Sequence, residues 1–154
     1  MALFSRRRRV HVALAIHKKV EIVMNGSCLC GSVTYEVDRI GPIGHCHCKT
    51  CRKAHAARFA STARAERNKF RWLSGSQYLR AYESSPGKLR HFCSQCGSHL
   101  MAEWKNQAQV IVRVATLDDD PGVVAAAHIW LSHDVPWLAD AADIKAFQES
   151  SDKS

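Results

Sequence analysis

The sequence predicts one mainly β domain with a short C-terminal helix. We expect small antiparallel sheets that are linked by bound metal ions. The length of 154 residues suits a single domain with its own core. Short segments rich in β-branched and aromatic residues alternate with turn signals, which favours strands. Seven cysteines stand in three tight groups, and none lies elsewhere. No apolar run reaches the roughly 18 residues of a membrane-spanning helix, so we expect no membrane segment.

The expected strands follow one another along the chain. They are residues 32–37, 58–62, 70–73, 77–83, 89–92, 100–104, 110–114 and 128–131. Residues 70–73 and 77–83 are expected to form a hairpin around the intervening Ser-Gly-Ser turn. The run VIVRV at 110–114 gives the strongest strand signal. Near the end, apolar residues at helical spacing predict the short helix over 140–148.

The first 23 residues differ from the rest in charge. They hold six basic residues and one acidic residue, whereas the remainder holds 16 basic and 13 acidic residues. Arg6 to Arg9 and the apolar stretch after them loosely resemble a signal or transit peptide, and an arginine-rich arm could also bind nucleic acid. We expect residues 1–23 to be a basic extension, either disordered or a misplaced start. Residues 24–149 should form the domain, and residues 150–154 should fray. A nucleic-acid partner is not expected, because the domain itself is only mildly basic.

The three cysteine groups have spacings that suit metal binding. Cys46, Cys48 and Cys51 form a Cys-x-Cys-x-x-Cys cluster, with a Cys-x-Cys pair before it and a Cys-x-x-Cys pair after it. Residues i and i+2 of an extended segment point to the same side, so Cys-x-Cys can aim two sulfurs at one point. Each flanking pair is followed by a glycine, which suits a tight turn whose thiolates hold one metal ion.

Seven thiolates divide naturally into four plus three, because zinc prefers four tetrahedral ligands. The flanking pairs would form one closed, structural zinc site from Cys28, Cys30, Cys93 and Cys96. Cys46, Cys48 and Cys51 would hold a second zinc with one open position, which is typical of a catalytic zinc. We therefore expect two zinc ions per chain. Free zinc-ligand thiols fit a reducing compartment, so we expect a cytoplasmic protein.

The seven cysteines could also form other kinds of site. Their odd number argues against a complete disulfide framework, but an iron–sulfur cluster could use the same ligands. The second site could also be a purely structural zinc completed by a histidine. The histidines near the cysteines in sequence are His45, His47, His55, His91 and His99.

Several motifs in a fixed order resemble those of the glutathione-dependent formaldehyde-activating enzyme family, whose domain is shared with centromere protein V. The matching segments are GSCLCGSVTY at 26–35, CHCKTCRK at 46–53, YESSPGK at 82–88, FCSQCGS at 92–98, TLDD at 116–119, HIW at 128–130 and PW at 136–137. Together they span about residues 24–147. The resemblance implies a tent-like β fold and the same four-plus-three division of zinc ligands. One departure is visible, because the glycine that commonly follows the three-cysteine motif is absent from residues 54–58.

The resemblance implies carbon–sulfur lyase chemistry on an adduct of a small-molecule thiol and an aldehyde, such as S-hydroxymethylglutathione. Glutathione is then the expected co-substrate, and its two carboxylates suit the basic side chains around the cluster. These candidate substrate contacts are Lys49, Arg52, Lys53 and Arg58. The reaction also needs a proton donor, for which His45 and His47 are nearest in sequence. The alternative is a non-enzymatic zinc-binding module that binds a macromolecular partner.

Overall fold

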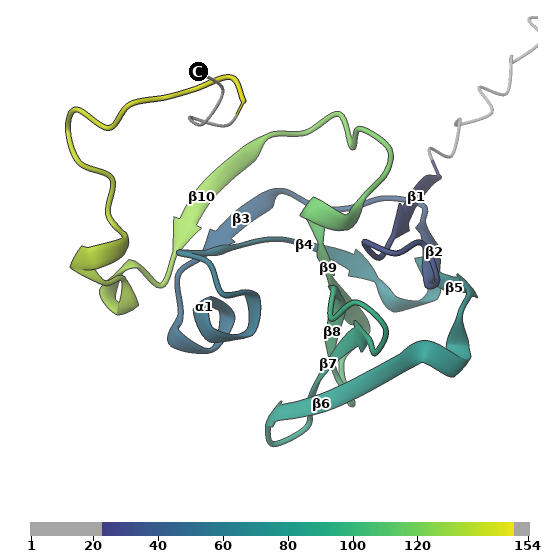
Figure 1. Cartoon of the computed structure of the whole chain (residues 1–154). Helices are drawn as coiled ribbons and strands as arrows, with labels where there is room; N and C mark the ends of the chain where they lie inside the picture. The colour runs from purple at the N-terminus through teal and green to yellow at the C-terminus, as the bar shows by residue number, and fades with distance from the viewer. Residues whose placement is uncertain (1–22, 150–154) are drawn as a thin grey trace, which may run out of the picture.

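The computed structural model describes residues 23–149, so the expectations for residues 1–22 and 150–154 lie outside it. Within that range the chain is mainly β, as predicted, with two sheets and one α-helix, α1 (Lys49–His55). β1 (Met24–Ser27), β2 (Thr34–Val37) and β5 (Phe70–Ser74) form an antiparallel sheet in the order β1-β2-β5. Figure 1 shows this sheet on the opposite side of the molecule from α1.

The larger sheet has seven strands in the order β10-β3-β4-β9-β8-β7-β6. Its strands are β3 (Ile43–Cys46), β4 (Ala60–Glu66), β6 (Leu79–Ser85), β7 (Lys88–Cys93), β8 (His99–Trp104), β9 (Gln109–Arg113) and β10 (Ala125–Ile129). All neighbours are antiparallel except β10, which pairs parallel with β3. Three short 3-10 turns lie between strands, at η1 (Arg67–Lys69), η2 (Ser76–Tyr78) and η3 (Val114–Thr116), and two more, η4 (Leu131–His133) and η5 (Pro136–Leu138), follow β10 in the described residues.

The core lies between the three-stranded sheet and the middle of the larger sheet. Its buried residues alternate along the strands, as the period-2 pattern of a half-buried strand requires. Tyr35 of β2 is fully buried, stacks on Phe70 at 5.0 Å between ring centroids and meets Trp72 edge-on at 6.0 Å. Its hydroxyl is 2.8 Å from the Thr116 hydroxyl, so the one polar atom of this ring is satisfied. Trp72 also lies 5.9 Å from the ring of His91 on β7, so this cluster connects the small sheet to a strand that ends in a cysteine.

The hairpin expected from residues 70–73 and 77–83 is not formed. β5 pairs with β2 in the small sheet, whereas β6 pairs with β7 in the large one. Gly75 stands between them with φ of +77°, a left-handed conformation that redirects the chain. Phe70 and Trp72 pack on Tyr35, and this tertiary contact overrides the local turn signal.

The prediction of a helix over residues 140–148 is also wrong. Those residues form turns and irregular structure, and the side chains of Ile144 and Phe147 are exposed. A short amphipathic segment without a surface to pack on gains too little to form a helix. The one α-helix of the described chain is α1, which begins inside the three-cysteine motif.

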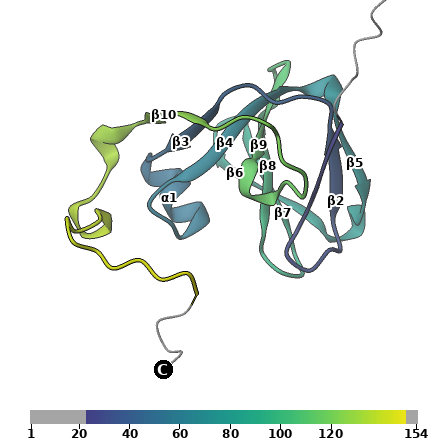
Figure 2. The same ribbon diagram turned by 90° about the horizontal axis from the view of Figure 1, so that it is seen from above.

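The C-terminal part of the described chain is largely solvent-exposed. β10 is an edge strand, and Trp130 and Trp137 are 58% and 76% exposed. Figure 2 shows the segment after β10 extending past α1, away from both sheets. No helix in residues 23–149 is long and apolar enough to cross a membrane.

Candidate metal centres

The four cysteines expected to form one site are brought together by two turns. Cys28 and Cys30 follow β1, and Cys93 ends β7 just before Cys96. Their four sulfurs lie within 4.8 Å of one another, with Cys28 and Cys30 Sγ atoms 3.5 Å apart and Cys30 and Cys93 Sγ atoms 3.9 Å apart. Four thiolates around one zinc at the usual bond length would stand about 3.8 Å apart. The donor set and its spacing therefore fit one metal ion.

Local backbone geometry explains why these sulfurs converge. Gly31 and Gly97 both have φ above +70°, which closes a tight turn after each cysteine pair. The Gly31 N–H donates to the Cys28 carbonyl at 2.8 Å, and the Gly97 N–H donates to the Cys93 carbonyl at 2.8 Å. The two turns are also joined directly, because the Leu29 N–H donates to the Ser98 hydroxyl at 3.0 Å. The cluster thus connects segments more than sixty residues apart in the chain.

The other three cysteines form a second cluster at the end of β3 and the start of α1. Cys46 is the last residue of β3, Cys48 is the N-cap of α1, and Cys51 lies in its first turn. The Cys48 sulfur accepts a hydrogen bond from the Cys51 backbone N–H at 3.4 Å. Their sulfurs all lie within 4.8 Å of one another, so this triad could also hold a metal ion. All seven cysteines lie in the described residues as free thiols, which excludes a disulfide framework.

Two buried arginines stand behind the triad. Arg90 on β7 is 2% exposed, and its Nη1 and Nη2 atoms lie 4.0 and 3.9 Å from the Cys51 sulfur. Arg113, at the end of β9, is 4% exposed, and its Nε and Nη2 have no hydrogen-bond partner. Hydrogen bonding from Cys46, then from Cys48, together with these two positive charges, holds the pKa of Cys51 well below its usual value. The surroundings therefore favour a thiolate at this position.

A cavity of about 560 Å³ adjoins the triad. It lies between α1 and strands β6 to β8, and its lining residues are Thr50, Lys53, Ala54, Tyr82, Ser84, Arg90, Phe92, Gly97 and His99. Thr50 comes from the triad motif itself, and Arg90 reaches both the cavity and the Cys51 sulfur. The Arg90 Nε also donates to the Ser84 hydroxyl at 2.9 Å. The volume is typical of a site for a small organic ligand.

The four basic residues proposed to contact the substrate take different positions. Lys53 lines the cavity, whereas Lys49 is exposed at the start of α1. Arg52 is partly buried, with its Nε lacking a hydrogen-bond partner, and it is not among the lining residues. Arg58 donates from Nε and Nη2 to the Asp134 carboxylate at 3.2 and 2.8 Å, so its charge is already paired.

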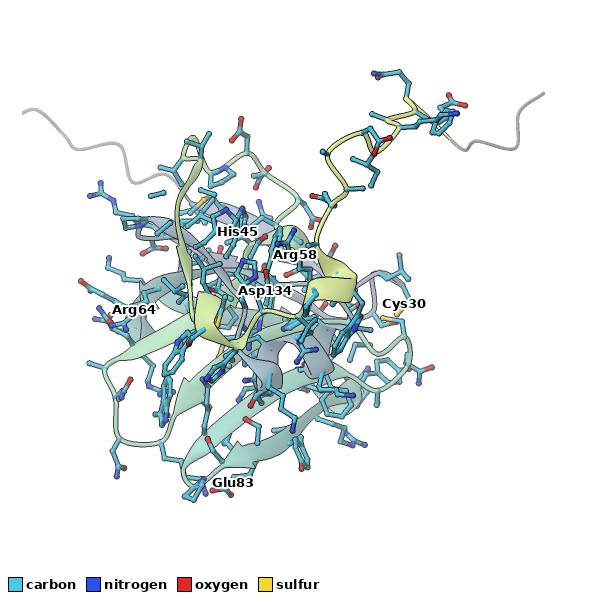
Figure 3. The ribbon with its side chains drawn as sticks, turned by 90° about the vertical axis from the view of Figure 1, so that its left-hand side faces the viewer. Cys30, His45, Arg58, Arg64, Glu83 and Asp134 are labelled. Carbon is cyan, nitrogen blue, oxygen red and sulfur yellow. The ribbon has the colours of Figure 1, made fainter. Side chains whose placement is uncertain are left out.

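The histidines nearest the triad in sequence belong to a network that is separate from the cavity. His47 is buried, with its Nε2 2.8 Å from the Nδ1 of His128 and its Nδ1 3.3 Å from the Asp134 carboxylate. The His45 Nδ1 is 3.1 Å from the Ser61 hydroxyl. Figure 3 shows His45, Arg58 and Asp134 gathered in one region of the molecule. These contacts attach β10 and η4 to the triad, and neither His45 nor His47 lines the cavity.

Sequence reasoning did not single out His99 or Arg90 as cavity residues. His99 lines the cavity, with its ring 5.0 Å from that of the half-buried His55, and burial lowers the pKa of both imidazoles so that they are neutral at pH 7. Arg90 comes from β7, far along the chain from the triad. The available signal was the YESSPGK motif, whose residues Tyr82 and Ser84 also line the cavity.

Comparison with known proteins identifies the family of this chain. The profile of the glutathione-dependent formaldehyde-activating enzyme family matches residues 23–133. A Halomonas elongata protein with the provisional name glutathione-dependent formaldehyde-activating enzyme is 27% identical over 128 residues, which cover 76% of this chain and 80% of that protein. A crystal structure of a Rhodobacter sphaeroides protein shares the fold, with a TM-score of 0.57 and 24% identity over 68% of this chain and 99% of that one. The chain belongs to the glutathione-dependent formaldehyde-activating enzyme family.

Proposed function

We propose that this chain is a zinc-dependent carbon–sulfur lyase-like enzyme that makes and breaks an adduct between glutathione, or another small thiol, and an aldehyde. S-Hydroxymethylglutathione is the simplest such adduct. One observation carries the proposal: three sulfurs converge beside a cavity whose lining carries positive charge. Family membership supports glutathione and formaldehyde as the reactants.

The two cysteine clusters take different roles in this proposal. Cys28, Cys30, Cys93 and Cys96 supply four ligands and would form a closed, structural zinc site. Cys46, Cys48 and Cys51 supply three ligands beside the cavity, so a zinc ion held there could take one ligand from the substrate. When bound, that ion supplies a positive charge that stabilises the substrate sulfur as a thiolate. The seven free thiols also support a reducing, cytoplasmic location.

The reaction itself is a reversible addition. The thiolate sulfur attacks the carbonyl carbon, a carbon–sulfur bond forms, and the carbonyl oxygen takes up a proton to become a hydroxyl. The reverse reaction removes that proton, restores the carbonyl and releases the thiolate. His99 and Ser84 line the cavity and have exchangeable protons, so they are placed to serve the oxygen. Lys53, also on the lining, can receive a glutathione carboxylate.

NMR exchange spectroscopy tests this proposal. Aldehydes and thiols also combine without a catalyst, so the test must compare the rate with protein to the uncatalysed rate. The rate of exchange between free formaldehyde and S-hydroxymethylglutathione can be measured by NMR with zinc-loaded protein and compared with the uncatalysed rate. We expect acceleration by the wild-type protein and none by Cys48→Ala, provided that its four-cysteine site keeps its zinc. Acceleration of equal size by both proteins would overturn the proposal.

A second function is favoured by the exposed C-terminal segment. Val124, Trp137 and Ile144 are large apolar side chains left in solvent, which is typical of a surface that binds another macromolecule. In that case the domain would be a non-enzymatic zinc-binding module. It would hold two zinc ions but would neither bind glutathione nor accelerate exchange, so the same experiment separates the two functions.

A further inference from the structure

Two buried positive charges lie beside the triad without a carboxylate to pair with them in the part of the chain that the structure describes. Arg90 and Arg113 are both buried, and neither forms an ion pair with a carboxylate among residues 23–149. Burying a guanidinium is costly unless an anion lies nearby. The anions beside these two residues are the triad thiolates, with the Cys51 sulfur 3.9 Å from Arg90. The arginines therefore belong electrostatically to the triad.

The charge of the metal-loaded triad does not neutralise Arg90 and Arg113. Three thiolates and a divalent metal ion carry a net charge of −1, whereas the two guanidiniums carry +2. The loaded site thus has an excess of positive charge in a buried setting, and the half-buried Lys88, which interacts electrostatically with both guanidiniums and with Cys48 and Cys51, adds to it. One further anion would reduce this excess.

The cavity provides the route by which such an anion could arrive. Arg90 lines it and also contacts Cys51, so a ligand that enters there meets the guanidinium next to the triad. Arg113 lies behind, with two nitrogen atoms, Nε and Nη2, that have no hydrogen-bond partner in the described part of the chain. Its side chain is closed off from solvent, so it acts through charge rather than by touching a large substrate.

We propose that Arg90 and Arg113 are specificity-determining residues, which make the loaded three-cysteine site select an anionic sulfur ligand, a thiolate, over a neutral one. Without them, a fourth anion would meet the net charge of −1 of a metal ion surrounded by three thiolates, which makes a neutral ligand more competitive. With them, binding a thiolate reduces the excess positive charge of the site. This inference rests on the proposed function and names the groups that allow a thiol to bind as its anion.

Cobalt-loaded protein provides a direct test, because the visible absorption of bound Co²⁺ reports a new ligand without any turnover. Two probes are titrated at one pH: 2-mercaptoethanol, which has no carboxylate, and imidazole, which is neutral. For Arg90→Met we expect the affinity for 2-mercaptoethanol to fall about tenfold or more, while that for imidazole changes less than about twofold. Arg90→Lys should restore most of the thiol affinity, and Arg113→Met should resemble Arg90→Met.

Arg80→Met is the matched control. Arg80 lies on the neighbouring strand β6 and is exposed, and its Nη1 donates to the backbone carbonyls of Gln77 and Leu79. The substitution removes the same charge from the protein without touching the triad, so both affinities should stay at the wild-type value. Thermal unfolding and metal content of each variant show that the fold is kept.

Several outcomes would overturn the inference. Thiol affinity that is unchanged in Arg90→Met, or that falls in parallel with imidazole affinity, would mean that the arginines are structural. A loss confined to glutathione, with 2-mercaptoethanol unaffected, would mean that Arg90 recognises a carboxylate instead. In these cases the wild type still binds thiols, so the proposed function stands. Failure of the wild type to bind any thiol would overturn both.

Discussion

Replacing Gly75 with alanine should destabilise the protein far more than the same change at Gly87. Both glycines have φ near +77°, so each substitution places an L-residue in the left-handed region, at a cost of about 1 kcal/mol. At Gly87 an added Cβ meets nothing within 4 Å, whereas at Gly75 it would lie 2.0 Å from the Ser32 carbonyl oxygen. The obstacle is backbone, which cannot rotate away, and it adjoins the buried Val33.

The magnitudes follow from this comparison. Overpacking against a fixed core costs about 1–3 kcal/mol, so we expect Gly75→Ala to lose about 2–4 kcal/mol and Gly87→Ala about 1 kcal/mol or less. The damage should reach the four-cysteine site, because the Val33 N–H donates to the Cys28 sulfur at 3.2 Å and the Ser32 hydroxyl is 3.3 Å from the Cys30 sulfur. Gly75→Ala should therefore also release metal faster to a chelator.

Urea unfolding at a fixed zinc concentration measures the two stabilities. Tryptophan fluorescence can follow the transition, and an unchanged slope would show that the two variants unfold between comparable states. Equal losses for Gly75→Ala and Gly87→Ala would refute the reasoning, because the left-handed backbone would then be the whole effect. Faster metal release from both variants would contradict the connection between Gly75 and the cysteines.

Other predictions follow from single contacts. Cys93→Ser should yield metal-poor, poorly soluble protein, and normal folding with full metal content would contradict its role as a ligand. Two ion pairs lower the pKa of Asp38, so its carboxylate stabilises the fold near pH 7 and the stabilisation is lost as the pH falls through that lowered pKa. The free energies of unfolding of Asp38→Asn and wild type should accordingly converge as the pH is lowered. A difference that stays constant with pH would exclude this role of the Asp38 carboxylate. Asp134→Asn should loosen η4 and speed proteolysis after β10, whereas Asp140→Asn, which removes only a 3.7 Å contact to Arg58, should not.

The sequence contained enough information to predict the cysteine clusters, because metal-ligand spacing is a local property. Cys46, Cys48 and Cys51 sit within one strand end and one helical turn, so their convergence follows from residues close in the chain. The pairing of Cys28 and Cys30 with Cys93 and Cys96 depended on counting ligands, and the sulfurs do lie together.

The sequence did not reveal the groups that reach the triad from other strands. Arg90 faces the core because of its register on β7, opposite Ala102 on β8, and no local pattern specifies that pairing. Phe70 and Trp72 looked like half of a hairpin, but their contact with Tyr35 assigns β5 to another sheet. The helix expected over 140–148 failed for the opposite reason, because its apolar side chains find no tertiary partner. In each case long-range packing decided the outcome.

Native mass spectrometry of the zinc-loaded protein, with and without glutathione, tests the central claim most directly. The account predicts two zinc ions per chain and a mass shift of one glutathione, with Cys48→Ala losing the shift and keeping the zinc of the four-cysteine site. Two zinc ions with no shift in the wild type, or an equal shift in Cys48→Ala, would contradict a thiol-binding site at Cys46, Cys48 and Cys51.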